Sequence, residues 1–150
     1  MSEGFQELKS KFSNLYGTFG VDPVLEQEGV ILRYELENGK KVLFKIKRAG
    51  SRNVEWRRLY NELMRPHEEA VLKGEVTEDV SKSRLSQVYA RSVVVDWKGI
   101  ENANGEEIPF SIDTCIELFQ FLPDLFLLVI RDANDRSNFR EEQVLATGKN

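Results

Sequence analysis

The stretch GVILRYELENGKKVLFKIKR, residues 29–48, decides the fold class because it has the pattern of an antiparallel β-hairpin. Apolar residues alternate with mostly polar ones on both sides of a central Asn-Gly, which is typical of strands with one buried face. A two-residue loop would set Leu32 against Lys45, whereas a three-residue loop at residues 37–39 gives one apolar face, so we predict the longer loop. The predicted cross-strand pairs are Val30 with Ile46, Leu32 with Phe44, and Tyr34 with Val42.

Apolar residues recur at helical spacing on both sides of the hairpin. The helices predicted from this spacing cover residues 3–19, 53–71, 77–95, 112–122 and 123–139. Asn53 and Ser111 can cap two of them, Pro66 should kink the second helix or begin a new one, and Pro123 suits the first turn of the last one. The predicted fold class is α+β: an N-terminal helix, one antiparallel β-hairpin, and a compact bundle of four to five α-helices.

The composition is that of one ordinary globular domain. The chain has 150 residues, of which 41% are hydrophobic and 31% are charged, and its net charge is −4. This acidic balance disfavours a protein that coats nucleic acid or an anionic membrane. We expect an N-terminal amphipathic helix or arm at residues 1–24, a single α+β domain at residues 25–139, and a mobile C-terminal tail at residues 140–150.

Neither the N-terminus nor the most apolar segment of the chain predicts a membrane protein. The N-terminus, MSEGFQELKSK, lacks the basic region and apolar stretch of a signal peptide. Polar residues and a proline interrupt residues 115–130, which also fall short of the ~20 residues needed to span a bilayer. The single cysteine, Cys115, cannot form an intramolecular disulfide, and its apolar neighbours predict a packed thiol. These features predict a cytoplasmic protein.

No arrangement of residues predicts catalysis. The sequence contains no phosphate-binding loop, no dinucleotide-binding glycine motif, no zinc-protease helix and no nucleophile elbow. Residues 132–138, DANDRSN, begin like a calcium loop, but Arg136 occupies a position that needs an oxygen ligand. The single histidine, His67, falls on an apolar helix face and is expected to pack there. We therefore expect a protein that is not an enzyme and has no cofactor or metal.

One stretch of the chain, residues 40–58, is strongly basic and has aromatic residues interleaved. Its candidate contact residues are Lys45, Lys47, Arg48, Arg52, Arg57 and Arg58. Such a patch can bind nucleic acid or dock an acidic protein. It can also be a solvated face that balances the acidic residues of 26–37. We expect nucleic-acid binding to be the less favoured of these interpretations.

Trp97 stands where a run of valines meets the polar loop KGIENANGEE, residues 98–107. The valines at 93–95 weaken helix propensity, so the end of the preceding helix is expected to fray into an extended segment. We expect the Trp97 ring to lie over the core and its indole N–H to bond to the loop. A contact between Trp97 and a partner is the alternative, because Trp is enriched where binding energy concentrates.

Residues 90–139 resemble the C-terminal half of the tail assembly chaperones of long-tailed, siphovirus-type bacteriophages. Both sequences carry the same features in the same order. These are a run of valines, a Trp followed by a basic residue and Gly, a polar loop that contains Gly, the sequence IPFS, a Leu/Phe-rich helix, the sequence PDLF, and an Asn-Phe pair near the end. The matching positions here are Val94, Trp97, Lys98, Gly99, Gly105, residues 108–111, residues 123–126, and Asn138-Phe139. The hairpin followed by KRAGSRNVEW is similar to their N-terminal half, so the resemblance covers roughly residues 25–139.

The resemblance implies a non-catalytic protein that binds the tape measure protein and recruits tail tube subunits. It implies action in the host cell cytoplasm and absence from the mature virion. Exposed apolar surface would bind helical segments of the partner. The predicted protein contacts are Phe5, Phe12, Phe19, Trp97, Phe119, Phe121 and Phe126. The alternatives are a nucleic-acid-binding adaptor that uses the basic hairpin and a structural tail component.

The last residues of the chain permit a programmed frameshift, by which such chaperones often gain a longer form. Gly148-Lys149-Asn150 can be encoded GGA AAA AAC, which contains the slippery heptamer A AAA AAC. We therefore expect the 150-residue chain to be the short product and a −1 extension to begin near Lys149. The longer form would then be a further partner of the short one.

Overall fold

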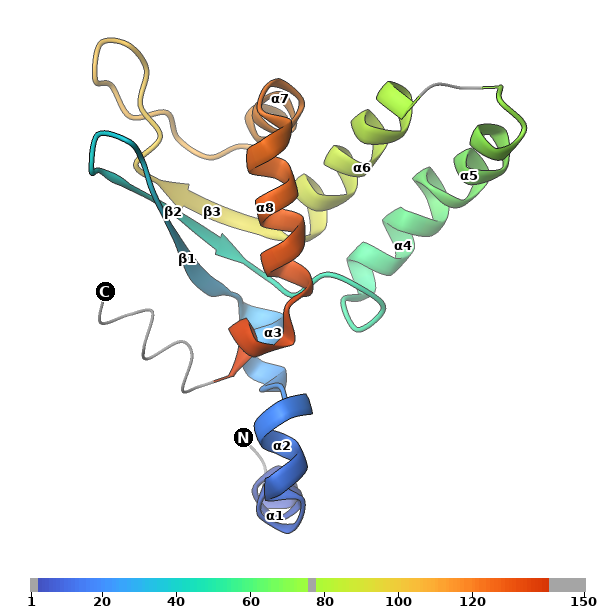
Figure 1. Cartoon of the computed structure of the whole chain (residues 1–150), viewed down its shortest axis with the longest axis vertical. Helices are drawn as coiled ribbons and strands as arrows, with labels where there is room; N and C mark the ends of the chain where they lie inside the picture. The colour runs from blue at the N-terminus through green and yellow to red at the C-terminus, as the bar shows by residue number, and fades with distance from the viewer. Residues whose placement is uncertain (1–2, 76–77, 141–150) are drawn as a thin grey trace.

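The predicted hairpin is present in the structure, a computed structural model that describes residues 3–75 and 78–140 (Figure 1). Strands β1 (Val30–Glu35) and β2 (Lys41–Ile46) pair antiparallel, and the three predicted pairs are confirmed. A hydrogen bond from the Leu36 N–H to the Lys40 carbonyl closes the loop. Within this loop, Gly39 has a φ of 85°. A left-handed residue in a three-residue loop is the geometry that the apolar face requires.

A third strand extends the sheet beyond the predicted hairpin. Helix α6 (Glu78–Ser92) ends earlier than predicted, and β3 (Val94–Lys98) pairs antiparallel with β2, so that the strand order is β1-β2-β3. The expected change from helix to an extended segment at the valines is therefore confirmed, although the helix ends at Ser92 and does not reach residue 95. β-Branched valines favour the pleated conformation, and the neighbouring strand offers them backbone partners that no sequence pattern revealed.

The other core helices follow the predicted signals closely. They are α4 (Val54–Leu63), α5 (Arg65–Leu72), α7 (Ile112–Phe121) and α8 (Pro123–Asn134). The Asn53 side chain accepts from the Trp56 N–H, and Ser111 accepts from the Thr114 N–H, as N-caps do. The last helix is shorter than predicted: Asp135 leaves the helical conformation and caps a separate 3-10 turn, η1 (Arg136–Phe139).

The N-terminal region is not the single helix predicted for residues 3–19. The chain bends at Phe12, whose φ and ψ of −113° and 34° are not helical, and this bend separates α1 (Glu3–Lys11) from α2 (Ser13–Phe19). A further short helix, α3 (Pro23–Glu28), follows, with Asp22 as its N-cap. Figure 1 shows α1 and α2 projecting away from the sheet and the other helices.

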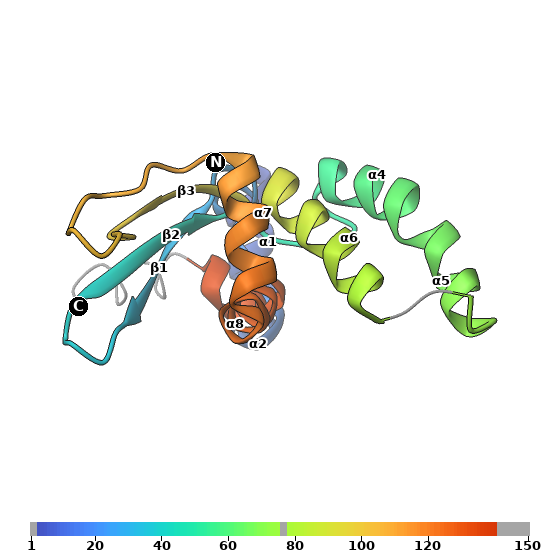
Figure 2. The same cartoon turned by 90° about the horizontal axis from the view of Figure 1, so that it is seen from above.

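The core lies where α6, α7 and α8 meet one face of the sheet. Figures 1 and 2 show α7 and α8 between the sheet on one side and α4, α5 and α6 on the other. The Tyr34 hydroxyl of β1 donates a hydrogen bond to Asp132 of α8 at 2.8 Å. Burial is the main reason why the pKa of Tyr34 lies far above its usual range, and this hydrogen bond raises it further. The fully buried side chains include Phe44, Ile46, Val88, Val93, Phe119, Val129 and Phe139.

The single cysteine takes the expected place in this core. Cys115 is completely buried, and burial raises the pKa of its thiol to about 12, which agrees with an inert packed cysteine. Within the described residues, no helix is long and apolar enough to cross a membrane. The predicted tail of residues 140–150 lies outside the described residues except for Arg140.

Gly99 is the position where a side chain would disturb the sheet most. Its φ is +89°, and a Cβ placed on it would lie 2.7 Å from the Lys41 carbonyl oxygen. We expect Gly99→Ala to lower the free energy of unfolding by more than about 2 kcal/mol, because a left-handed alanine costs ~1–2 kcal/mol and the carbonyl must also move. Urea unfolding followed by circular dichroism measures this change.

Gly105→Ala is the matched control for Gly99→Ala. Gly105 also has a positive φ, +78°, but a Cβ there meets nothing within 4 Å. It should therefore show only the backbone cost of about 1 kcal/mol. Equal destabilisation by the two substitutions would contradict the close approach of Gly99 to β2.

Candidate functional site

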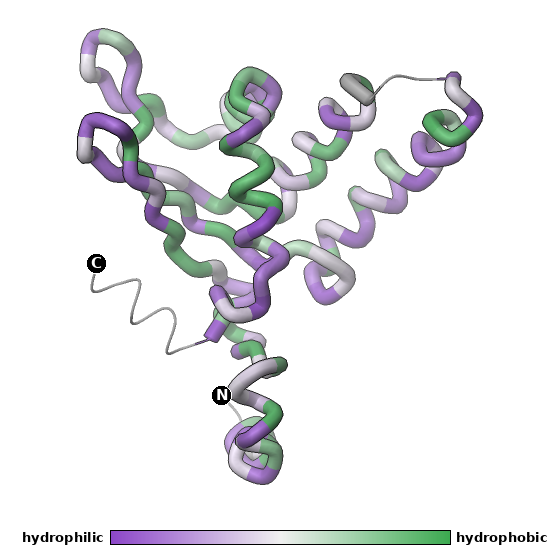
Figure 3. Tube along the Cα trace, in the orientation of Figure 1, coloured by the Kyte–Doolittle hydropathy of each residue, from purple (hydrophilic) through white to green (hydrophobic). Residues whose placement is uncertain are grey.

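The N-terminal helices carry the clearest candidate binding surface. We call it the arm groove, a hollow of about 350 Å³ between α1 and α2. Its lining residues are Phe5, Leu8, Lys9, Phe12, Leu15, Tyr16, Phe19 and Gly20. The bend at Phe12 forms it by folding α1 back toward α2, which brings the Phe5 ring 6.1 Å from the Tyr16 ring. Figure 3 shows the apolar segments along this part of the chain.

The apolar side chains of the arm groove are unusually exposed. The exposed fraction is 49% for Phe12 and 63% for Phe19, and Leu8 and Leu15 are also more than half exposed. Helix α2 has no buried residue at all. An amphipathic helix normally buries its apolar face against the core, so this face is available to another molecule. Phe5, Phe12 and Phe19 were predicted contacts, and the structure brings all three together in the groove.

Two arginines near the C-terminal end of the described chain hold the arm. Arg140 donates to the carbonyl oxygens of Gly17 at 2.8 Å and Gly20 at 2.7 Å, and also to that of Thr18. Arg136 donates to the Thr18 carbonyl at 2.9 Å, and its guanidinium lies 5.0 Å above the Phe19 ring. Cationic groups at the end of α2 satisfy its last carbonyls and complement its dipole. The arm is therefore positioned by polar contacts that leave its apolar face open.

The corner between α7 and α8 is a second apolar surface. Phe121 is 79% exposed there, and Leu127 is 62% exposed one turn into α8. Phe119 and Phe126 point the other way and are buried, with their rings stacked at 4.7 Å. Of the three phenylalanines predicted as contacts in this region, only Phe121 lies on the surface. The helical period explains this difference, because residues two positions apart face opposite sides.

Trp97 is only 4% exposed, so its indole belongs to the core. Its Nε1 donates to the Ile108 carbonyl at 2.8 Å, and its ring makes edge contacts with Phe44 at 5.9 Å and Phe110 at 5.1 Å. The expected position over the core and the expected bond to the loop are both present. A partner can reach Trp97 only at the edge of a hollow that Ile100 and Phe121 also line.

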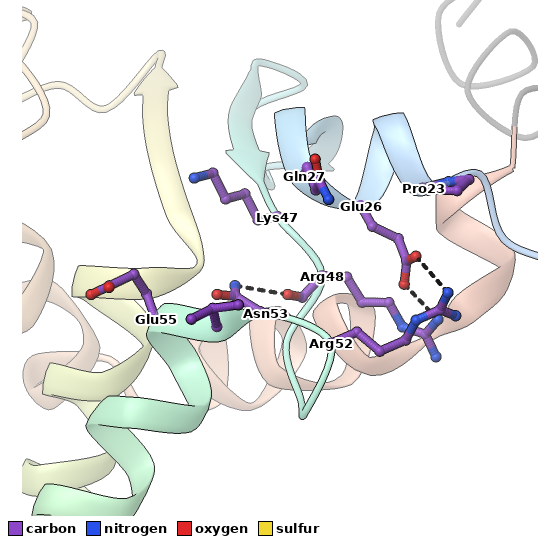
Figure 4. Close-up of a pocket in the computed structure, with 9 residues that line it drawn as sticks. Pro23, Glu26, Gln27, Lys47, Arg48, Arg52, Asn53 and Glu55 are labelled. Atoms are coloured by element: carbon purple, nitrogen blue, oxygen red, sulfur yellow. Dashed lines mark hydrogen bonds and ion pairs between the residues drawn. The ribbon is translucent and has the colours of Figure 1, made fainter. Parts of the chain in front are cut away.

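Intramolecular ion pairs compensate much of the predicted basic patch. Glu26 of α3, 8% exposed, binds Arg48 at 3.0 Å and Arg52 at 3.4 Å (Figure 4). Arg58 binds Glu55 at 2.8 Å and Glu62 at 3.0 Å on the surface of α4. The remaining predicted residues of the patch are Lys45 and Lys47, which are partly buried, and Arg57, which is exposed. The net positive charge offered to a polyanion is thus lower than the sequence indicated.

The sequence indicated that the basic stretch could balance the acidic residues of 26–37, but it did not identify Glu26 as the partner of two arginines. Glu26 lies 22 residues before Arg48, and no local pattern links them. The backbone reinforces the contact, because the Arg48 N–H donates to the Glu26 carbonyl at 3.2 Å. Asn53 adds a bond from its side-chain amide to the Arg48 carbonyl at 2.9 Å. These contacts fix α3 to the segment that joins β2 and α4.

Removal of the Glu26 charge tests this junction. We expect Glu26→Gln to lower the free energy of unfolding by about 2 kcal/mol, because the partly buried Arg48 loses its charged partner. Glu55→Gln removes a fully exposed carboxylate that pairs with Arg58 and should cause a much smaller change. Chemical unfolding of both variants at the same pH measures the difference. Equal effects would show that burial does not strengthen the Glu26 pairs.

The arrangement nearest to a catalytic one is a bond between His67 and Ser81. The His67 Nε2 lies 2.8 Å from the Ser81 Oγ, and His67 is buried. A serine nucleophile also needs a group that orients the histidine and donors for an oxyanion. None of the hydrogen bonds between described residues supplies either, so this bond is a contact between α5 and α6. Residues 3–75 and 78–140 also hold no cluster of three metal-binding side chains.

The fold and its surfaces define a small α+β protein with apolar helical surface outside its core. A family model described as YdaY prophage protein matches residues 49–150, which is more than half of the chain. The chain therefore belongs to the YdaY prophage protein family. Searches of curated proteins and of solved structures gave no match. The family confirms the predicted bacteriophage origin, whereas the assignment to tail assembly chaperones stays a prediction.

Proposed function

We propose that this phage protein is a non-catalytic tail assembly chaperone. It binds the tape measure protein and recruits tail tube subunits during tail assembly, in the cytoplasm of the host cell, and is not retained in the mature virion. A −1 frameshift near Lys149 would supply a longer form as an additional partner. The exposed apolar face of the arm groove is the observation that carries this proposal.

The arm groove has the properties of a surface that receives an amphipathic helix. Its lining is almost wholly aromatic and aliphatic, and Lys9 is the charged residue at its edge. Apolar anchors of a helix spaced at i, i+3, i+4 and i+7 fit such a groove. Phe12 is the N-cap of α2 and Phe19 is its last residue, and both offer large side chains for these anchors. A long, helical tape measure protein would present such anchors repeatedly before the tail forms around it.

The alternative of nucleic-acid binding has less support on the surface. Three of its six predicted contacts, Arg48, Arg52 and Arg58, already bind carboxylates within the chain. Phosphate contacts would have to displace these partners. Binding through phosphates also weakens steeply with salt, whereas binding to an apolar groove responds little. Salt dependence therefore separates the two functions.

Co-expression tests the proposed function directly. The chain is produced with the tape measure and tail tube proteins of the same phage and purified at low and high salt. We expect both proteins to co-purify and the complex to survive high salt. The proposal would be contradicted if neither protein co-purified. It would also be contradicted if the chain retained nucleic acid at low salt and lost it at high salt.

Substitution in the arm groove tests its role in this binding. We expect Phe12→Ser with Phe19→Ser to weaken the complex with the tape measure protein at least about tenfold, because each buried Phe contributes ~1.5–3 kcal/mol. Leu72→Ser is the matched control, since Leu72 is 87% exposed at the end of α5, away from the arm. Calorimetric titration measures both affinities. Equal affinity of the double variant and the control would exclude the groove as the binding surface.

A further inference from the structure

Strand β1 forms one edge of the three-stranded sheet (Figure 1). The Leu36 N–H donates to the Lys40 carbonyl, so this pair is hydrogen-bonded. Along an antiparallel pair of strands, hydrogen-bonded residue pairs alternate with pairs that are not hydrogen-bonded. The even residues of β1 therefore bond to β2, while Ile31, Arg33 and Glu35 direct their N–H and C=O groups outward. No other described residue hydrogen-bonds these outward groups. All three residues are exposed.

The two edges of the sheet differ in their protection. At the β3 edge, the Asp96 carboxylate accepts the outward N–H of Trp97 at 2.8 Å, and a register shift interrupts the pairing with β2. Side-chain capping and bulges are devices that blunt an edge. Strand β1 has six residues, VILRYE, without proline, glycine or a register shift. Its exposed charges, Arg33 and Glu35, are of opposite sign, so the edge remains a template for a strand whose charges match them.

The charges of β1 are self-complementary. Arg33 and Glu35 flank Tyr34 and lie on the open face of the sheet. An antiparallel pair of β1 strands related by a two-fold axis at Tyr34 sets Arg33 of each copy opposite Glu35 of the other. This register makes both pairs hydrogen-bonded ones, because odd residues carry the outward groups. Opposite charges directly across an antiparallel pair are stabilising.

The neighbouring helix adds apolar surface beside the same edge. Asp132 of α8 holds the Tyr34 hydroxyl, so this side of α8 faces β1. Leu128 lies one turn earlier on that side and is 38% exposed. A two-fold axis perpendicular to the sheet keeps α8 of both copies on the same face. Leu128 of both copies would therefore lie on the same face of the joined sheet.

We propose that two copies of this chain associate through their β1 edges and form one continuous sheet. The interface is isologous, as in most homodimers. It uses the backbone groups of Arg33 and Glu35 and two cross-strand ion pairs between these residues, whereas Ile31 lies opposite the hairpin turn of the other copy. The arm groove and the α7–α8 corner take no part in it, so the dimer does not rest on the proposed chaperone function.

A charge-exchange experiment tests the dimer and its register. Sedimentation equilibrium of the full chain should give twice the 17.3 kDa mass at high micromolar concentration. Arg33→Glu and Glu35→Arg should each raise the dimer dissociation constant about tenfold, because two attractive pairs become repulsive ones. An equimolar mixture of the two variants should recover the mass of the dimer. Arg57→Glu reverses an exposed charge on α4 and should leave the dimer unchanged.

Amide hydrogen exchange locates the contact independently of these variants. The amides of Arg33 and Glu35 should exchange rapidly in dilute protein and become protected as the concentration rises, whereas the Ile31 amide should stay unprotected. A wild-type chain that stays monomeric would overturn the proposal. So would a dimer that both single variants leave intact, since that dimer uses another surface. Protection of the Arg33 and Glu35 amides at every concentration would show that the chain itself covers the edge, and would overturn it equally.

Discussion

Burial of the Phe44 ring sets the register on which the other elements depend. The ring is fully buried at the centre of β2, with Tyr34 at 5.8 Å and Trp97 at 5.9 Å on the flanking strands. Side chains alternate between the faces of a strand, so a slip of one residue would turn Lys45 into the core. The same register directs Arg33 and Glu35 to the open face. The interior therefore determines what the surface of the sheet can bind.

The phenylalanines of α7 and α8 are divided between the core and the surface. Phe119 and Phe126 stack inside, while Phe121 lies outside because the helical period turns it away. The N-terminal arm is different, since the whole apolar face of α2 stays outside the core. Exposure of this kind on a defined helix pair marks a binding surface more often than isolated apolar residues do. The arm groove and the α7–α8 corner are thus two separate apolar surfaces.

Local signals were sufficient for the hairpin, the caps and the helix breaks. The Asn-Gly loop, Asn53, Ser111 and Pro123 each act on their own neighbours, so their consequences can be read without knowing the fold. The third strand, the bend at Phe12 and the exposure of individual candidates could not be predicted in this way. Val94 and Val95 become a strand only because β2 lies beside them. Phe119 and Phe121 have the same chemistry, and only the position of α6 separates core from surface.

The sequence by itself determined the fold class, the hairpin register, the N-caps and the absence of a standard catalytic motif. These follow from periodicity and from interactions within a few residues. The tertiary structure decided which charges are compensated and which apolar faces stay open. Glu26 meets Arg48 and Arg52, and Arg140 meets the carbonyls of α2 across 120 residues of chain. Such contacts depend on how separate elements pack, because their partners share no spacing in the sequence.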